Sequence, residues 1–345
     1  AFVINCVSLS LSLSYKLCFT FSHFLDPTWP SLILPSWRKD SLTISFLIWM
    51  ADHDFDYINK TVYSIESVAV RSTWAGYCLF VIASSLIGDT TILIASTKYR
   101  AFKLHRTIVA IIQHIAFCDL MVSTIDILPR FVYIVSNDWV LGNFICYLTG
   151  YGRYVVNAVS TLLISTLTCS KFLQLKYPFR FRLVTTTTAH VICAACWVAA
   201  LTFPITFLLV DKHDIYPSFR DYQCIHAASS DVWLWLKLLL AAVFMFIPTC
   251  LVIVGTIFIM IIARRSRTSL KWQGIMIIVL IATVYSISIL PLFVYHFGAT
   301  ILPADESNSF FYIDFYRVAI SILSLNTISN FYIYLSLIHI SEPTR

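Results

Sequence analysis

The feature that most constrains this chain is the stretch 143–179, which carries almost no charge until its last residues. A helix of about 30 apolar residues exceeds the ~20 that a bilayer requires, so it crosses a membrane with a tilt or protrudes from it. Arg153, Asn157 and Ser160 are spaced by four and three residues and therefore share one face of this helix. Because lipid cannot satisfy polar groups, this face is expected to line a protein interior or a water-filled cavity.

The composition is typical of an integral membrane protein. Of 345 residues, 59% are hydrophobic and 12% are charged, which is about half the charged fraction of a soluble domain. The net charge of +6 is therefore interpreted through membrane topology, and no nucleic-acid partner is expected. No pattern of metal ligands, catalytic triad or phosphate loop indicates an enzyme. Six cysteines lie in apolar runs, where a thiol packs as a small hydrophobe: Cys78, Cys118, Cys169, Cys193, Cys196 and Cys250.

Seven apolar stretches predict an all-α membrane protein, a seven-transmembrane-helix bundle that occupies residues 73–334. Four of the stretches contain a proline, which membrane helices tolerate as a kink. The expected limits are 73–97, 107–132, 143–172, 188–210, 232–263, 273–298 and 310–335.

Lys and Arg concentrate in the loops after the first, third and fifth stretches, whereas the opposite loops are richer in Asp. The positive-inside rule therefore predicts an extracellular N-terminus and three cytoplasmic basic loops. Asn59 opens an Asn-Lys-Thr glycosylation sequon, which predicts the same orientation. We expect a multi-pass protein of the plasma membrane, with lipid around the bundle.

The two ends of the chain differ in composition from the bundle. Residues 1–49 are rich in Ser, Leu and Phe, and an acidic segment follows Met50. We expect 1–49 to be a non-native translated leader and 50–72 to be the extracellular N-terminus; a cleaved or extended native N-terminus is the alternative. Residues 335–345 read like the in-frame translation of a sequencing adapter, so they are expected to be non-native rather than a short native tail.

Cys146 and Cys224 are the two cysteines after residue 50 that this topology places at the outer surface. The extracellular side is oxidising, so we expect a disulfide that tethers the loop before the fifth helix to the top of the third. The alternative is two free thiols.

An ordered set of motifs resembles the rhodopsin-like (class A) G protein-coupled receptors over residues 73–334. Each motif alone is weak evidence, but their order along the chain is specific. The matches are Gly88-Asp89 for Gly-Asn, Ile115–Leu120 (IAFCDL) for LAxxDL, Trp139, Gly142 and Cys146 for WxxGxxxC, Trp197, Pro248, Pro291, and Asn330–Tyr334 (NFYIY) for NPxxY. The spread of departures within these motifs indicates a divergent or orphan member.

The resemblance implies a receptor, not an enzyme, that transduces an extracellular ligand into activation of a heterotrimeric G protein by rearranging its helices. Two alternatives stay open. One is a receptor-fold protein that binds ligand without signalling. The other is a transporter, which internal repeats would indicate, and none is visible in this sequence.

Asp119 lies near mid-membrane, where a carboxylate costs about 2.5–3.5 kcal/mol on insertion scales and needs polar partners. The resemblance implies that an allosteric sodium ion binds there, because hard cations prefer oxygen ligands. The alternative is a protonated carboxyl within a hydrogen-bond network. Asp89 replaces the family's Asn, and two carboxylates would share a proton or recruit a cation. The implied sodium ligands are Asp119, Ser160, Asn326 and Asn330, and no other cofactor is expected.

Arg153 stands where amine receptors of the resembled family hold an Asp, which argues against a biogenic amine as the ligand. A guanidinium binds carboxylate or phosphate, so the expected ligand is anionic or a peptide. The alternative is an internal ion pair or a snorkelling side chain. The residues expected to complete the pocket are Tyr154, Asn157, His296 and Tyr316.

The cytoplasmic switch departs from the family pattern. Ser170-Lys171-Phe172 replaces Asp-Arg-Tyr, and Lys271 stands where many members have an acid, so the usual ionic clamp cannot form. Thr256 replaces a Tyr and Ile289 replaces a Trp, although Tyr334 is retained. These changes predict either raised basal activity or weak or absent coupling to the G protein.

Overall fold

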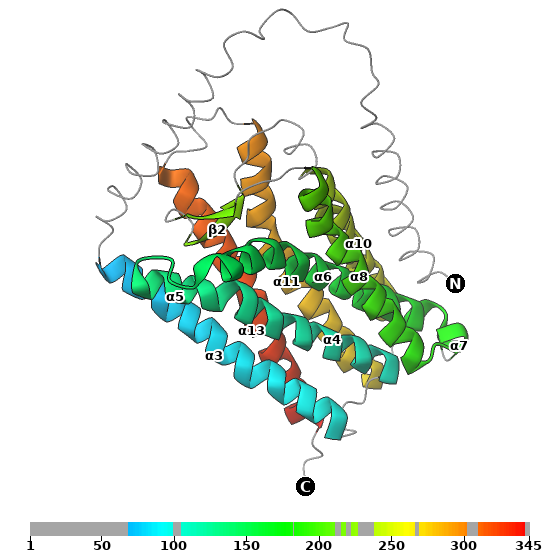
Figure 1. The fold of residues 1–345 in the computed structure, drawn as a ribbon. Coiled ribbons are helices and arrows are strands. Elements are labelled where there is room, and N and C mark those ends of the chain that lie inside the picture. The colour runs from blue at the N-terminus through cyan, green and yellow to red at the C-terminus, as the bar shows by residue number, and fades with distance from the viewer. Residues whose placement is uncertain are drawn as a thin grey trace, which may run out of the picture.

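Helices account for nearly all of the residues whose structure is described (Figure 1). The structure is a computed structural model of the 345-residue chain. The expected leader 1–49 and the sequon at Asn59 lie outside the described residues, as does most of segment 50–72. The described residues are 68–98, 105–181, 183–210, 215–218, 222–226, 238–265, 269–301 and 310–341.

Within these residues, helical segments lie where the sequence predicts the seven spans, which confirms the all-α class. A short helix, α7 (Pro178–Phe181), also follows the third span, and the last helix extends into segment 335–345. In chain order the spans are α3 (Val68–Lys98); α4 (Arg106–Val122) with η1 (Ser123–Ile127) and α5 (Leu128–Ser136); α6 (Gly142–Lys176); α8 (Thr186–Val210); η2 (Ala242–Phe246) with α10 (Ile247–Arg265); α11 (Ser269–Ile301); and α13 (Phe310–Ser341).

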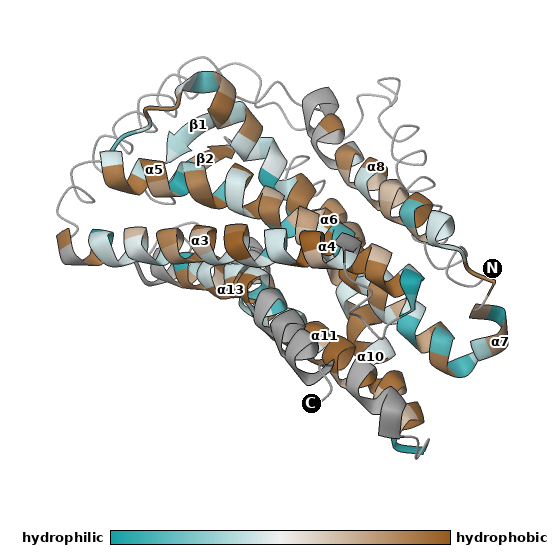
Figure 2. Ribbon diagram, turned by 90° about the horizontal axis from the view of Figure 1, so that it is seen from below, coloured by the Kyte–Doolittle hydropathy of each residue, from teal (hydrophilic) through white to brown (hydrophobic). Residues whose placement is uncertain are grey.

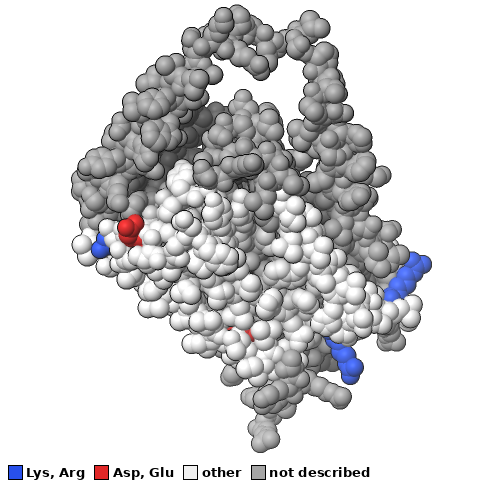
Figure 3. Space-filling view, viewed as in Figure 1, with Lys and Arg blue, Asp and Glu red and all other residues white. Residues whose placement is uncertain are grey.

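The outer surface of the bundle is apolar. Five helices among the described residues are long and apolar enough to cross a membrane, and α8 contributes a shorter apolar helix. Phe80, Val198 and Ile287 expose 52%, 66% and 64% of their surface, as lipid-facing side chains do. Hydrophobic residues cover much of the helices in Figure 2, and charged groups in the face shown in Figure 3 lie mainly toward its margins.

Two of the spans contain a π-helical turn. η1 ends two residues before Pro129 in the second span, and η2 ends two residues before Pro248 in the fifth. A proline ring clashes with the preceding helical turn and lacks an N–H donor, so a wider turn accommodates it. The turn η1 also contains Asp126, which lines the central cavity described below.

The helix α6 is the centre of the bundle. Its 35 residues pack against α4, α8, α10, α11 and a β-hairpin. Close approach of α10 depends on Gly255, because a Cβ there would lie 2.8 Å from Cγ2 of Thr168. Val159, Leu163 and Ile164 are 0% exposed and form the middle of the hydrophobic core.

The β-hairpin lies across one end of the bundle (Figure 1). Its antiparallel strands are β1 (Ile215–Ser218) and β2 (Gln223–His226), with Pro217 opposite Cys224. A disulfide joins Cys224 to Cys146 of α6 with a Cα–Cα distance of 5.4 Å, so the disulfide predicted from the sequence is present. We call this end of the bundle the disulfide end and the opposite one, where α6 terminates, the Lys171 end.

Candidate ligand cavity and polar core

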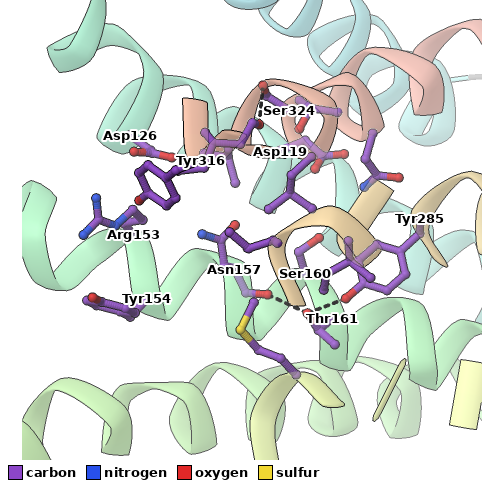
Figure 4. A pocket seen from close by; sticks show the side chains of 18 residues that line it. Asp119, Asp126, Arg153, Tyr154, Asn157, Ser160, Thr161, Tyr285, Tyr316 and Ser324 are labelled. Atoms are coloured by element: carbon purple, nitrogen blue, oxygen red, sulfur yellow. Dashed lines mark hydrogen bonds between the residues drawn. The ribbon is translucent and has the colours of Figure 1, made fainter. Parts of the chain in front are cut away.

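A cavity of about 80 Å³ lies inside the bundle between the second span, α6, α11 and α13. Arg153 and Asp126 line its part near the disulfide end, and Asp119 and Asn326 line its deeper part. Figure 4 shows Arg153, Asp126 and Tyr316 together on one side of the cavity and Asp119 on the other. Polar groups from four spans therefore meet around one interior space.

The polar face of α6 points into this cavity. Arg153, Asn157 and Ser160 all line it, as does Tyr154 (Figure 4). Their spacing along the helix places them one above another, which is the arrangement expected from the sequence. The face that lipid could not satisfy is thus turned toward other helices.

Arg153 is 7% exposed, and its guanidinium carbon lies 5.1 Å from the centre of the Tyr154 ring. Within the described part of the chain, the ion pair that forms is between Arg130 and Asp126, at 3.2 Å, and does not include Arg153. The alternative interpretation of Arg153, an internal ion pair, is therefore not seen among these residues. A guanidinium that lines a cavity without a carboxylate partner is suited to an anionic group.

A chain of hydrogen bonds crosses the disulfide end. Nη2 of Arg130 donates to Oδ1 of Asp126 at 3.2 Å and to Oε1 of Gln223 at 2.6 Å. Nε2 of Gln223 in turn donates to the Tyr316 hydroxyl at 2.7 Å. The β-hairpin is thereby connected to both the second span and α13.

Sequence reasoning named Tyr316 but missed its neighbours in this chain. Asp126 and Arg130 carried a signal, since two charges four residues apart within an apolar span need an interior environment. Gln223 carried none, because a loop amide gives no indication of which helix it will contact.

The deep part of the cavity adjoins a polar core. Oδ2 of Asp119 accepts a hydrogen bond from Nδ2 of Asn330 at 2.8 Å. Oδ2 of Asp89 accepts one from the Ser85 hydroxyl at 2.7 Å, and that hydroxyl also lies 3.4 Å from the Asp119 carbonyl oxygen. Asp89 and Asn330 are 0% exposed and Asp119 is 1% exposed, so two carboxyl groups are buried together.

Three oxygens of this core have no hydrogen-bond partner within the described part of the chain: Oδ1 of Asp89, Oδ1 of Asn326 and Oδ1 of Asn330. Buried acceptors without donors are rare in folded proteins because they are costly to desolvate. A hard cation or an ordered water would supply the missing interaction, and all-oxygen ligands suit the cation. The side chains present therefore fit a cation of the sodium type, with Ser160 in the cavity lining beside Asp119.

Tyr285 of α11 lines the cavity, and it was not singled out from the sequence. Its hydroxyl donates to Oγ1 of Thr161 at 2.6 Å, which joins α11 to α6 (Figure 4). Ile289, the residue in place of the family's Trp, lines the cavity one turn away. The described α11 side chains that line the cavity are therefore a tyrosine, an isoleucine and Leu292.

At the Lys171 end, the substituted switch residues are packed inside. Ser170 is 4% exposed and Lys171 is 6% exposed, with the Lys171 Nζ donating to Oε1 of Gln174 at 3.0 Å. The Phe172 ring lies 6.1 Å from that of Phe258 on α10. The side chains of His296, Lys271 and Tyr334 lie outside the described residues.

His105, directly before α4, is also at the Lys171 end and packs against Phe181 at a ring distance of 5.1 Å. Partial burial lowers the pKa of its imidazole, and the positive charge of Lys171 lowers it further. Lys171 therefore lowers the pKa of a residue on a neighbouring segment and also donates a hydrogen bond within its own helix.

Helical spans around a polar cavity, with a disulfide-tethered hairpin across one end, define the class of seven-helix membrane receptors. The family described as 7 transmembrane receptor (rhodopsin family) matches residues 88–334. The chain belongs to this family, whose members are multi-pass receptors of the plasma membrane and not enzymes.

Curated relatives include receptors of several invertebrates. The annetocin receptor of Eisenia fetida is 24% identical over 168 residues, which cover 48% of this chain and 38% of the relative. The gonadotropin-releasing hormone receptor of Octopus vulgaris is 25% identical over 245 residues, covering 63% and 56%. Dopamine receptor 2 of Caenorhabditis elegans is 26% identical over 178 residues, covering 50% and 20%. The matches span between a fifth and just over half of these relatives' own lengths.

Proposed function

We propose that this protein is a G protein-coupled receptor that binds an extracellular ligand at the disulfide end and activates a heterotrimeric G protein at the Lys171 end. The observation that carries the proposal is the central cavity, where α6, α11 and α13 contribute side chains to one lining. A ligand in this cavity contacts three helices at once. It therefore favours whichever arrangement of those helices it binds more tightly, and shifts the population toward that state.

We propose further that the ligand presents an anionic group to Arg153. The similar proteins include a dopamine receptor and also the QRFP-like peptide receptor of Branchiostoma floridae, so homology does not choose between an amine and a peptide. Charge supports the second, because the lining acid nearest the disulfide end, Asp126, is already paired with Arg130. An ammonium group at Arg153 would face a like charge in a buried site, whereas a carboxylate would be paired bidentately.

Cavity size limits how the ligand enters. A volume of about 80 Å³ is far below the roughly 300–1,000 Å³ of pockets that enclose a drug-sized molecule. It admits a single side chain or a terminal carboxylate. The proposed ligand is therefore a peptide that inserts one anionic group, with the rest of its length over the disulfide end.

The test uses pairs of peptides that differ only in a carboxylate or a carboxamide, applied to cells that express the receptor with a complete native tail. We expect an active acid form to lose about 2 kcal/mol of binding, roughly 30-fold in potency, in Arg153→Gln, and its preference over the amide to vanish. Arg71→Gln removes a positive charge from α3 outside the cavity lining and serves as the matched control. An agonist whose potency is unchanged in Arg153→Gln would contradict this part of the proposal.

We propose that the polar core binds a sodium ion, with Asp119, Ser160, Asn326 and Asn330 as its ligands. The unpartnered oxygens of Asn326 and Asn330 favour this proposal over a plain hydrogen-bond network, because such a network needs donors that the described residues do not supply. With Asp89 as a second buried carboxyl, we propose that the two acids hold one cation and share one proton.

The orientation belongs to the same proposal, with the N-terminus and the disulfide end outside the cell. The oxidising environment that a disulfide requires supports it, since Cys146 and Cys224 are joined. Asn59→Gln tests it by electrophoresis. The unmodified chain is expected to give a band that a glycosidase shifts, and Asn59→Gln is expected to lose it. An unmodified chain that carries no glycan would remove this support for an extracellular N-terminus.

A second candidate function is ligand binding without signalling, which the buried Ser170 and Lys171 favour. Restoring Asp-Arg-Tyr at positions 170–172 and measuring nucleotide exchange on a purified G protein separates the two. A receptor that already activates the G protein without the restoration is a signalling receptor, and one that activates it only afterwards is a binding protein.

A further inference from the structure

A second, smaller hollow of about 30 Å³ lies at the disulfide end between α3, α5 and α13. Trp74 and Tyr77 of α3 form one wall, and Tyr222, directly before β2, closes it from the hairpin. Ile320 and Ser324 border both this hollow and the central cavity, so the two spaces are neighbours. The hollow is outside the set of residues assigned to the ligand or to sodium.

The lining of this hollow is positively charged. Arg130 from α5 and Arg317 from α13 both line it, and its described lining contains no Asp or Glu. Arg317 is 5% exposed, with its guanidinium carbon 4.8 Å from the centre of the Tyr222 ring. Two guanidinium groups on separate helices are thus held around one small space by the tertiary fold.

One N–H donor of Arg130 has no acceptor among the described residues. Its Nη2 serves Asp126 and Gln223, but its Nε is buried and has no hydrogen-bond partner among the described residues. A buried donor without an acceptor is destabilising, and in a charged group the cost is greater. An acceptor of negative charge inside the hollow would remove that cost and would also screen the repulsion between the two arginines.

We propose that this hollow is a binding site for a small monovalent anion, and that chloride is the anion it holds. A space of this size holds roughly two water molecules, or one spherical anion of similar volume. Arg130 and Arg317 supply charge and N–H donors, while the indole and phenol walls from α3 keep the site dry enough for the charges to matter. The bound anion connects α5 to α13 and thereby stabilises the disulfide end whether or not a receptor ligand is present.

The test measures the unfolding temperature of the purified full chain in nanodiscs, without any receptor ligand. Sodium chloride, bromide, acetate and gluconate are compared at equal sodium concentration and ionic strength, so that neither screening nor the polar core contributes. We expect the unfolding temperature to rise with chloride, to saturate, to rise similarly with bromide, and to stay constant in gluconate. Arg317→Gln is expected to abolish the rise, and Arg71→Gln to keep it.

The variant also separates an anion site from a merely structural arginine. An anion site predicts that, without chloride, Arg317 and Arg130 repel each other across an unfilled hollow. Arg317→Gln in gluconate should then be at least as stable as the unmodified chain in gluconate, whereas loss of a merely structural arginine would make the variant less stable. Should the variant fail to fold, line broadening of chloride in chlorine NMR by the unmodified chain, reversed by excess bromide, supports the site independently. The proposal is overturned if the rise of unfolding temperature with chloride does not saturate, or if it is equal in Arg317→Gln. A rise with acetate in the absence of chloride would also overturn it, because it marks a subsite for a ligand carboxylate. So would the absence of line broadening in chlorine NMR.

Discussion

The two ends of the central cavity carry opposite charge. Near the disulfide end, the acid that lies with Arg153 and its neighbour Arg130 among the described residues is Asp126, whereas the deep core holds Asp89 and Asp119 together with amide oxygens. The first environment favours an anion and the second a cation, although they share one interior space. Burial alone therefore does not determine what a polar cavity binds, because the excess charge at each point selects the sign of the bound ion.

The ends also differ in what holds them together. The polar core consists of residues on the helices themselves, such as the direct bond from Asn330 to Asp119. The disulfide end depends on a segment between helices, since Gln223 of the hairpin links Arg130 to Tyr316. This contrast predicts that changes in the hairpin disturb the cationic end and leave the anionic core intact.

The largest expected effect comes from breaking the tether. Changing Cys146 and Cys224 together to Ser should lower the free energy of unfolding by about 2–4 kcal/mol, because the crosslink that restricts the unfolded chain is lost. It should also abolish ligand binding at the disulfide end. Thermal unfolding in nanodiscs measures the first effect, and Cys250→Ser, an exposed free thiol, is the control that should match the unmodified protein. Retention of the sodium response in the double variant would uphold the contrast between the ends, and its loss would break it.

The next effect compares the acids at the two ends of the cavity. Asp119→Asn should abolish the rise of unfolding temperature with sodium, because the proposed ion loses its main charged ligand. At sodium concentrations of roughly 10 to 100 times its Kd, a bound ion stabilises by about 1.4–2.7 kcal/mol. Asp126→Asn, which removes an acid from the other end, should keep the sodium response even if its own stability falls. Equal responses in the two variants would mean that the core has no specific cation site.

A smaller loss is expected from Gln223→Leu, which removes two hydrogen bonds of which one is to a charged group. The predicted cost is about 1–2 kcal/mol of stability, confined to the disulfide end. Hydrogen exchange should rise in β2 and at the disulfide end of α13 but not around Asn330. Uniformly faster exchange through the bundle would show that the hairpin supports more of the fold than its contacts indicate.

The smallest effect concerns the Lys171 end and its own positive charge. The imidazole of His105 should titrate below its ordinary pKa of 6.5, because burial and the Lys171 ammonium both disfavour its charged form. Since the unfolded chain then binds more protons, this histidine lowers stability only as the pH falls below 6.5. Lys171→Gln should move the His105 pKa upward in an NMR titration, whereas Lys176→Gln, five residues further along α6, should not.

Much of the architecture could be predicted because a membrane makes local sequence informative. A polar residue within an apolar span must face protein, so the spacing of Arg153, Asn157 and Ser160 indicated the inner face of α6 before any contact was known. The same reasoning identified Asp119 and, through the oxidising exterior, the bond between Cys146 and Cys224. Each of these inferences needs only the position of a residue in its own helix or loop.

The network at the disulfide end could not be predicted in this way. Gln223 lies 93 residues from Arg130 and 93 residues from Tyr316 along the chain, and no local pattern marks it as their common partner. Arg130 and Arg317 read from the sequence as unrelated charges in separate spans, yet both line one hollow.

The class of fold, the spans and the polar face of α6 therefore follow from the amino-acid sequence, because the cost of placing polar groups in lipid acts on each helix separately. Which charges meet depends on how the helices pack. The packing of α3, α5 and α13 beneath the hairpin brings two arginines around one hollow. The packing of α3, α4 and α13 buries two carboxyl groups beside two amide oxygens that have no hydrogen-bond partner among the described residues.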